Sequence, residues 1–196
     1  IKKNYNIVSF DYLIYNQNYS KNLIKNDKYK FIYGDLREKK EISGALKNID
    51  HVVILAGLVG DPITKKYPKL SHDINYNGIK NFIDICSKYK YINKIIFIST
   101  CSNYGLLNNE IKADEQTRLK ALSLYSKDKV KIENYILSMK DNSDLTPTIL
   151  RFSTAFGYSP RMRFDLTLNE FTMEILNKKS LIIYDKNTWR PYCHVK

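Results

Sequence analysis

The chain lacks the cysteine and histidine patterns that would form disulfides or a metal site. It has three cysteines, an odd number, and they stand far apart at Cys86, Cys101 and Cys193. None belongs to a Cys-x-x-Cys pair, and together with the three histidines they give no spacing typical of metal ligands. We therefore expect a reduced, cytoplasmic protein that holds no metal.

Long apolar runs and basic clusters are also lacking. No segment resembles a transmembrane helix or a secretory signal, so we expect no membrane partner. The net charge is +12, but no basic run exceeds two residues and none is interleaved with stacking aromatics. We therefore expect no nucleic-acid partner, although a basic protein would suit an anionic substrate.

Short apolar runs alternate with longer amphipathic stretches, which is typical of an α/β fold with a parallel sheet. The predicted strands are 5–10, 30–33, 51–56, 94–99 and 147–152. The predicted helices are 38–47, 71–89 and 122–140. Strand 51–56 is continuously apolar, so it is predicted to be covered on both faces. With 196 residues, 43% of them hydrophobic, the chain can form one domain and a fraction of another.

Small and polar residues stand where the predicted strands end. They are Asp11, Gly34–Asp35, Ala56–Gly57, Ser99–Thr100 and Phe152–Ser153. In parallel α/β sheets, ligands bind beyond the carboxyl ends of the strands. A strand-end turn would explain each position singly, but it explains the whole series poorly. We therefore expect a cofactor along this edge.

Two further features indicate acid–base chemistry. Thr100 ends a buried strand, and Tyr125 and Lys129 form a Tyr-x-x-x-Lys pair that shares one face of the predicted helix. A neighbouring ammonium favours phenolate, so we expect the pKa of Tyr125 to fall from its usual value of about 10. Because the chain has 16 tyrosines, a solvated helix face would explain the pair equally well when taken alone.

At this point the chain resembles the extended short-chain dehydrogenase/reductase family, the NAD-dependent epimerases and dehydratases of nucleotide sugars. The segments that are similar to family motifs are 34–37 (Gly-Asp-Leu-Arg), 55–62, 73–78, 98–105, 150–157 and 190–195, in the family's order. The resemblance implies a Rossmann-type, doubly wound parallel sheet. It also implies NAD as cofactor and, for the intact protein, a homodimer.

The resemblance also implies roles for individual residues. Tyr125 would be the acid–base residue, Lys129 would lower its pKa, and Thr100 would hold the reacting sugar oxygen. The residues implied in cofactor binding are Asp11, Asp35, Leu36, Leu55, Ala56, Gly57, Ser99, Tyr125, Lys129 and Phe152. An acidic Asp11 would favour NAD over NADP, because it repels a 2′-phosphate. Thr100, Asn169 and Arg190 would contact the substrate, a nucleotide-diphosphate sugar, although a helix-surface role for Asn169 is equally compatible with the sequence.

The chain departs from the family pattern in three places, one of which is Thr154–Ala155, where many members have Asn. Dehydratases of the family carry Asp-Glu after the Thr, where this chain has Cys101 and Ser102, so sugar 4,6-dehydration is disfavoured. The glycine-rich turn Gly-x-x-Gly-x-x-Gly is missing, together with the family's first strand and helix. We therefore expect a fragment, inactive by itself, with a truncated NAD-binding domain over 1–155 and the start of a substrate-binding region over 156–196. Without the first strand, its two neighbours in the sheet have nothing between them.

These observations favour an NAD-dependent nucleotide-sugar epimerase that uses Tyr125 as acid and base. A 4-keto-sugar reductase or a dehydratase of the same family would share these residues. A non-catalytic NAD-binding relative on the same fold is a further alternative. The presence of both Tyr125 and Lys129 disfavours it, because such relatives typically lose one of the two.

Overall fold

The computed structural model describes residues 4–15, 24–107, 112–139, 145–183 and 186–196. Two parallel sheets form its centre. In the first, β1 (Ile7–Asp11) pairs with β2 (Tyr29–Tyr33). The second has the order β3 (His51–Ile54), β4 (Lys94–Thr100) and β5 (Thr146–Phe152). A small third sheet joins β6 (Thr154–Phe156) to β7 (Tyr192–His194).

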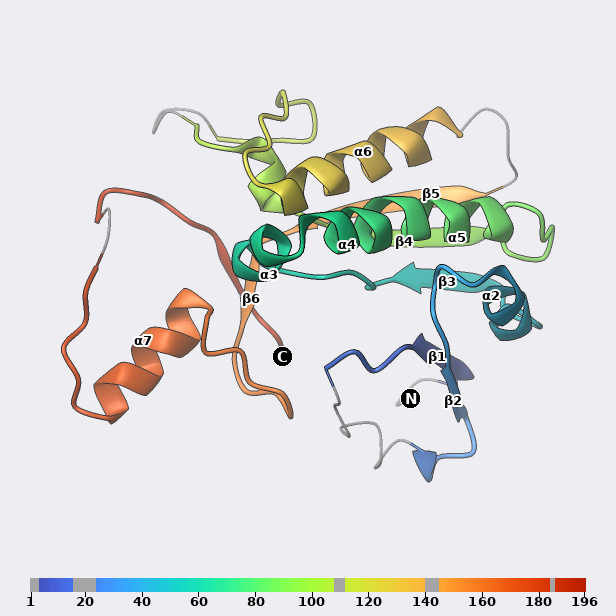
Figure 1. Ribbon diagram of the computed structural model, residues 1–196, viewed down its shortest axis with the longest axis horizontal. Coiled ribbons are helices and arrows are strands. Elements are labelled where there is room, and N and C mark those ends of the chain that lie inside the picture. Colours follow the sequence, from blue (N-terminus) through green and yellow to red (C-terminus); the bar gives the residue numbers. More distant parts are fainter. Residues whose placement is uncertain (1–3, 16–23, 108–111, 140–144, 184–185) are drawn as a thin grey trace.

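The helices lie mainly against the second sheet (Figure 1). They are α2 (Lys39–Ala45), α3 (Asp61–Lys66), α4 (Pro68–His72), the π-helical turn η1 (Asp73–Gly78), α5 (Ile79–Cys86), the 3₁₀ turn η2 (Cys101–Tyr104), α6 (Leu124–Ser138) and α7 (Thr167–Leu176). Helix α6 begins after Ser123, whose hydroxyl accepts a hydrogen bond from the Ser126 amide at 3.2 Å and so caps the helix.

The core lies on one face of the β3–β4–β5 sheet. Ile95 and Phe97 of β4 alternate with half-buried residues and pack against Ile79 and Ile83 of α5 and Ile132 of α6. Spacing of four residues on α5 and of two on β4 brings these side chains to one surface. The packing of α5 and α6 on β4 therefore fixes the position of the carboxyl end of β4.

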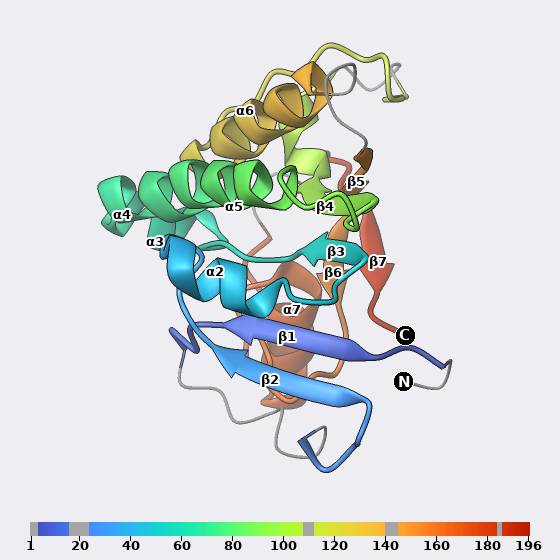
Figure 2. The same cartoon turned by 90° about the vertical axis from the view of Figure 1, so that its right-hand side faces the viewer.

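The predicted α/β fold of Rossmann type is confirmed, and so is the gap in the sheet. Strands β2, β1 and β3 follow one another with their arrowheads on the same side (Figure 2), but β1 and β3 are not hydrogen-bonded to each other. The carboxyl ends of these strands therefore lie along one edge, as the sequence predicted.

The prediction for one strand was wrong. Strand β3 is covered on one face only: Val52 and Ile54 are buried, whereas Val53 is 52% exposed because the core lies on the opposite face.

The predicted helix 71–89 is present as α4, η1 and α5, which follow one another without a break from residue 68 to residue 86, with the π-helical turn inside the run. The domain boundary expected between residues 155 and 156 lies within β6 and stays a prediction.

Within the described ranges, no helix combines the length and the apolar character needed to cross a membrane.

Candidate active site

Two carboxylates stand at or just beyond the carboxyl ends of β1 and β2. Asp11 is the register partner of Tyr33, and its backbone carbonyl accepts a hydrogen bond from the Gly34 amide at 3.2 Å. Its side-chain Oδ1 accepts from the Leu13 amide at 2.6 Å. Asp35 follows Gly34 and forms a salt bridge of 2.6 Å with Arg37, which holds the pKa of that carboxyl below its ordinary value.

Two hydrogen bonds made by Asn75 of η1 hold the loop after β3 in place. Asn75 is buried, its Oδ1 accepts from the Leu58 amide at 2.7 Å, and its Nδ2 donates to the Leu58 carbonyl at 2.9 Å. A Cβ on Gly57, where φ is 141°, would lie 2.9 Å from Asn75 Oδ1. Leu55 and Ala56 are left exposed at the strand edge. No role was predicted for Asn75, whose only signal in the sequence was its place within the motif at 73–78.

At the end of β4, neighbouring residues point in opposite directions. Thr100 is paired in register with Phe152 of β5, and its Oγ1 accepts from the Ser102 amide at 3.2 Å. Ser99 is buried, and its hydroxyl donates to Glu133 of α6 at 2.5 Å. The Ser99 side chain therefore points into the core, which leaves only its main chain at the edge for the predicted cofactor contact.

Lys129 reaches from α6 to the backbone of β4. It is 3% exposed, and its Nζ donates to the Ile98 carbonyl at 2.7 Å. The same nitrogen lies 4.5 Å from the ring centroid of Phe97 and 5.7 Å from that of Tyr125. Burial lowers the pKa of Lys129 to about 8, and the nearby Glu133 carboxylate opposes this fall.

The expected fall in the pKa of Tyr125 is wrong for this structure. Burial raises the pKa of Tyr125 to about 12, and the cation that opposes the rise is Arg163 rather than Lys129. Arg163 forms a salt bridge of 2.5 Å with Asp165, and its Nη2 lies 3.1 Å from where a Cβ on Gly60 would be. The sequence did not point to Arg163, because only the fold brings residue 163 beside the loop after β3.

Arg190 is exposed. Its Nε donates to Thr154 Oγ1 at 2.9 Å. Burial raises the pKa of the Cys101 thiol, and the positive charge of Arg190 partly offsets this rise. Among the described residues, Arg190 has no salt-bridge partner. The structure thus places a cation beside the residue that follows Thr100.

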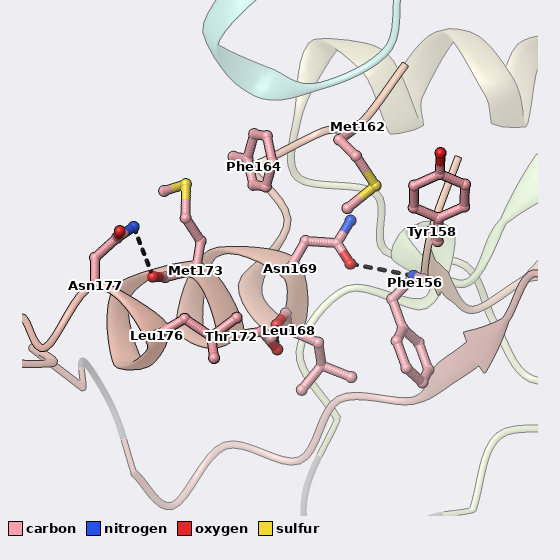
Figure 3. A pocket seen from close by; sticks show the side chains of 11 residues that line it. Phe156, Tyr158, Met162, Phe164, Leu168, Asn169, Thr172, Met173, Leu176 and Asn177 are labelled. Atoms are coloured by element: carbon pink, nitrogen blue, oxygen red, sulfur yellow. Dashed lines mark hydrogen bonds between the residues drawn. The ribbon is translucent and has the colours of Figure 1, made fainter. Parts of the chain in front are cut away.

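Asn169 lies in the wall of a mainly apolar pocket of about 580 Å³ between β6 and α7 (Figure 3). Its Oδ1 accepts from the Gly157 amide at 3.1 Å, and its Nδ2 donates to the Arg163 carbonyl at 3.0 Å. Phe156, Met162 and Phe164 line the same pocket. Asn169 therefore holds the shape of the pocket with both ends of its amide.

In the part of the chain that the structure describes, no three His, Cys, Asp or Glu residues are grouped so that they could hold a metal ion.

Because of Lys129, the free energy of unfolding should rise as the pH increases from 8 to 9. Its pKa is about 8 when folded and about 10.5 when unfolded, so in this range the unfolded chain binds more protons and the free energy of unfolding rises with pH, by about 1 kcal/mol. The buried Cys86, with its pKa raised from 9.0 to about 12, acts in the opposite direction within the same range and offsets about a third of the gain. Chemical denaturation at the two pH values measures the gain. Lys129→Met should abolish it, and an equal gain in that variant would contradict the assignment to Lys129.

The fold and the site together define a class. It is an α/β protein whose strand ends form the candidate ligand-binding edge and whose helix α6 carries a Tyr-x-x-x-Lys pair next to that edge. The chain belongs to the NAD dependent epimerase/dehydratase family, whose model matches residues 2–196. The resemblance stated from the motifs is thereby confirmed.

Individual relatives agree with this. The uncharacterized UDP-glucose epimerase YtcB of Bacillus subtilis is 27% identical and covers 84% of this chain. UDP-glucuronate 4-epimerase 1 of Arabidopsis thaliana is 30% identical over 78% of the chain. The structure of UDP-glucuronic acid 4-epimerase from Bacillus cereus, in complex with UDP-glucuronic acid and NAD, is 25% identical with a TM-score of 0.84 and covers 97% of this chain.

The chain spans half or less of these curated relatives, 50% of the Bacillus subtilis protein and 36% of the Arabidopsis one, and 61% of the Bacillus cereus chain.

Proposed function

We propose that the complete protein is an NAD-dependent nucleotide-sugar 4-epimerase. The observation that carries this proposal is the placement of Lys129 between Tyr125 of α6 and the end of β4, where Thr100 stands. A phenol, an ammonium and a hydroxyl at one strand end are the groups that proton exchange with a sugar hydroxyl requires. Several of the curated relatives are named as 4-epimerases of UDP-sugars, which supports the same reaction.

The residues along the strand ends fit a dinucleotide. Leu55 and Phe152 are large apolar side chains that stand exposed at the edge, where a bound ring would cover them. Gly57 allows close approach of the backbone. Asp11 and Asp35 lie where the ribose and the adenine would be held, and Leu36 follows Asp35. Bound along this edge, NAD would supply a hydride acceptor and, once reduced, a hydride donor.

The chain's own residues would handle the proton. Tyr125 would take the proton of the sugar 4-hydroxyl and later give it back, while Thr100 holds the same oxygen by a hydrogen bond. Since burial raises the pKa of Tyr125, the phenol needs a nearby positive charge to act as a base. Arg163 supplies such a charge in this structure, and Lys129 lies one helical turn from the phenol.

The substrate would lie across β6. Arg190, held by Thr154 at the start of β6, would pair with the diphosphate, because guanidinium groups bind phosphate oxygens in bidentate geometry. The apolar pocket at Asn169 begins at the other end of the same strand and would receive a flat, less polar part of the substrate. Cys101 and Ser102 provide no carboxyl group for eliminating water, which disfavours the dehydratase alternative.

The direct test is turnover by the complete protein. With NAD present, UDP-glucuronic acid and UDP-glucose are each incubated with the protein, and the 4-epimers are followed by proton NMR. Formation of either 4-epimer, with no net formation or consumption of NADH, supports the proposal. Consumption of NADH with a 4-keto sugar, and no epimer from either UDP-sugar, would instead establish the reductase. Light scattering of the same sample tests the homodimer that we expect of the complete protein.

Asp11→Ala should weaken NAD binding and narrow the preference for NAD over NADP. The carboxylate stands at the end of β1, where it would bind a ribose hydroxyl and repel a 2′-phosphate. Titration of the complete protein with each dinucleotide measures both effects. Asp27→Ala, in the exposed turn before β2, is the matched control. An unchanged NAD/NADP ratio would show that Asp11 only forms the turn to Leu13.

A further inference from the structure

An ion pair with a buried carboxylate joins α6 to β5 beside the strand end that carries Thr100. Glu133 of α6 is 1% exposed, and Arg151 of β5 donates to its carboxylate from Nη2 at 2.7 Å and from Nε at 3.1 and 3.2 Å. Burying two charges costs desolvation free energy that their attraction does not always repay, so such a pair is weak evidence for stability alone. A role in the site would explain why the pair is there.

The same carboxylate gathers hydrogen bonds from several elements. Its Oε1 accepts from the Ser99 hydroxyl of β4 at 2.5 Å and from Asn103 Nδ2 of η2 at 2.8 Å. Asn103 also donates to Ser99 at 3.0 Å, and Arg151 Nη1 donates to the Tyr104 hydroxyl at 3.1 Å. One buried carboxylate therefore ties α6, β4, β5 and η2 together.

Three residues of this hydrogen-bond network are close in sequence to proposed functional residues. Ser99 precedes Thr100, and Arg151 precedes Phe152, which is the register partner of Thr100. Glu133 follows Lys129 by one helical turn, on the same face of α6. Loosening the network would therefore shift the hydroxyl of Thr100 relative to the helix that carries Lys129.

The charges around Lys129 single out Glu133 as well. Lys129 contacts the Ile98 carbonyl and the ring of Phe97 on β4, and on α6 it faces the ring of Tyr125. Asp128, the next carboxylate on the helix, is paired with His72 of α4 and with Lys131. Within the described residues no carboxylate forms a salt bridge with Lys129, and Glu133 is the group whose charge favours its ammonium.

We propose that the Glu133–Arg151 pair is a positioning element of the site, which holds the end of β4 against α6, and that the Glu133 carboxylate stabilises the Lys129 ammonium one helical turn away. The proposal rests on the proposed function only in the roles given to Thr100 and Lys129. Glu133 and Arg151 themselves do not touch substrate. Their effect on Lys129 is measurable without turnover, so failure of the proposal and failure of the epimerase assignment are distinguishable.

The test follows the Lys129 side chain by NMR in protein labelled with ¹³C at lysine Cε. The Lys129 signal is the one that titrates near pH 8 and disappears in Lys129→Gln. In Glu133→Gln, which keeps the shape and loses the charge, it should titrate below about 8. In Arg151→Gln it should titrate above about 8, because the positive charge that is paired with Glu133 has been removed.

The opposite signs separate this role from a structural one, since both variants break the same ion pair and both should lower stability. Shifts in the same direction, or no shift in either variant, would overturn the proposal. Glu170→Gln, on the exposed side of α7, is the control and should leave the signal in place. If Glu133→Gln does not fold, the double variant Glu133→Gln with Arg151→Gln takes its place, because it leaves neither charge of the ion pair without a partner. Its signal should then titrate below that of Arg151→Gln, and an identical pKa would refute the proposal.

Discussion

Tyr125→Phe in the complete protein should lower turnover by about 10²–10⁴-fold and leave NAD binding nearly unchanged. The substitution removes one hydroxyl, and this hydroxyl is the group proposed to exchange a proton with the sugar. Burial of the ring is preserved, so the packing of α6 on β4 should survive. Turnover of a UDP-sugar and fluorescence titration with the dinucleotide measure the two effects separately.

Tyr135→Phe is the matched control on the same helix. The Tyr135 hydroxyl donates to Asp84 of α5, away from the strand ends, so its loss should leave turnover close to that of the unchanged protein. If Tyr125→Phe retains turnover within about threefold of the unchanged protein, the phenol has no part in proton transfer, which typically contributes far more than this.

The periodicity of the sequence was enough to locate the elements that carry the site. Strand β4 and helix α6 lie within about two residues of their predicted ranges, because an apolar strand and an amphipathic helix each have a distinctive spacing. The prediction failed for β3, where an unbroken apolar run was interpreted as double coverage. Which faces of a strand are covered depends on the other elements, and Val53 shows that composition alone does not decide it.

The residues of the candidate site also fall into two groups, those that local motifs could predict and those that only the fold brings together. Thr100, Tyr125 and Lys129 could be predicted from motifs because each motif is local. Glu133, Arg151 and Arg163 were not predicted, because their partners are far away in the sequence and only the fold brings them together. The inward direction of Ser99 could have been predicted, since it shares the strand alternation of Ile95 and Phe97.

Arg190→Ala should raise the Michaelis constant for a nucleotide sugar about 30-fold and leave that for NAD nearly unchanged. Loss of a charge-assisted hydrogen bond to phosphate costs about 2 kcal/mol, which corresponds to this factor. Its position supports the role: Thr154 holds the Nε, and the guanidinium is exposed, close enough to Cys101 to influence the thiol. Steady-state kinetics of the complete protein, with each ligand varied in turn, measure the two constants.

Arg161→Ala is the control, because it removes an equal charge. Arg161 stacks on Tyr15, with its guanidinium carbon 4.0 Å from the ring centroid. If both variants raise the same constant equally, the effect is that of overall charge, which attracts an anion without a specific contact. Arg190→Lys distinguishes further, since a lysine keeps the charge and loses the bidentate geometry. A partial rise in the constant for the nucleotide sugar alone would place the diphosphate at Arg190. An equal rise for NAD would instead place Arg190 at the cofactor, and the class of substrate would then have to be argued from the pocket between β6 and α7.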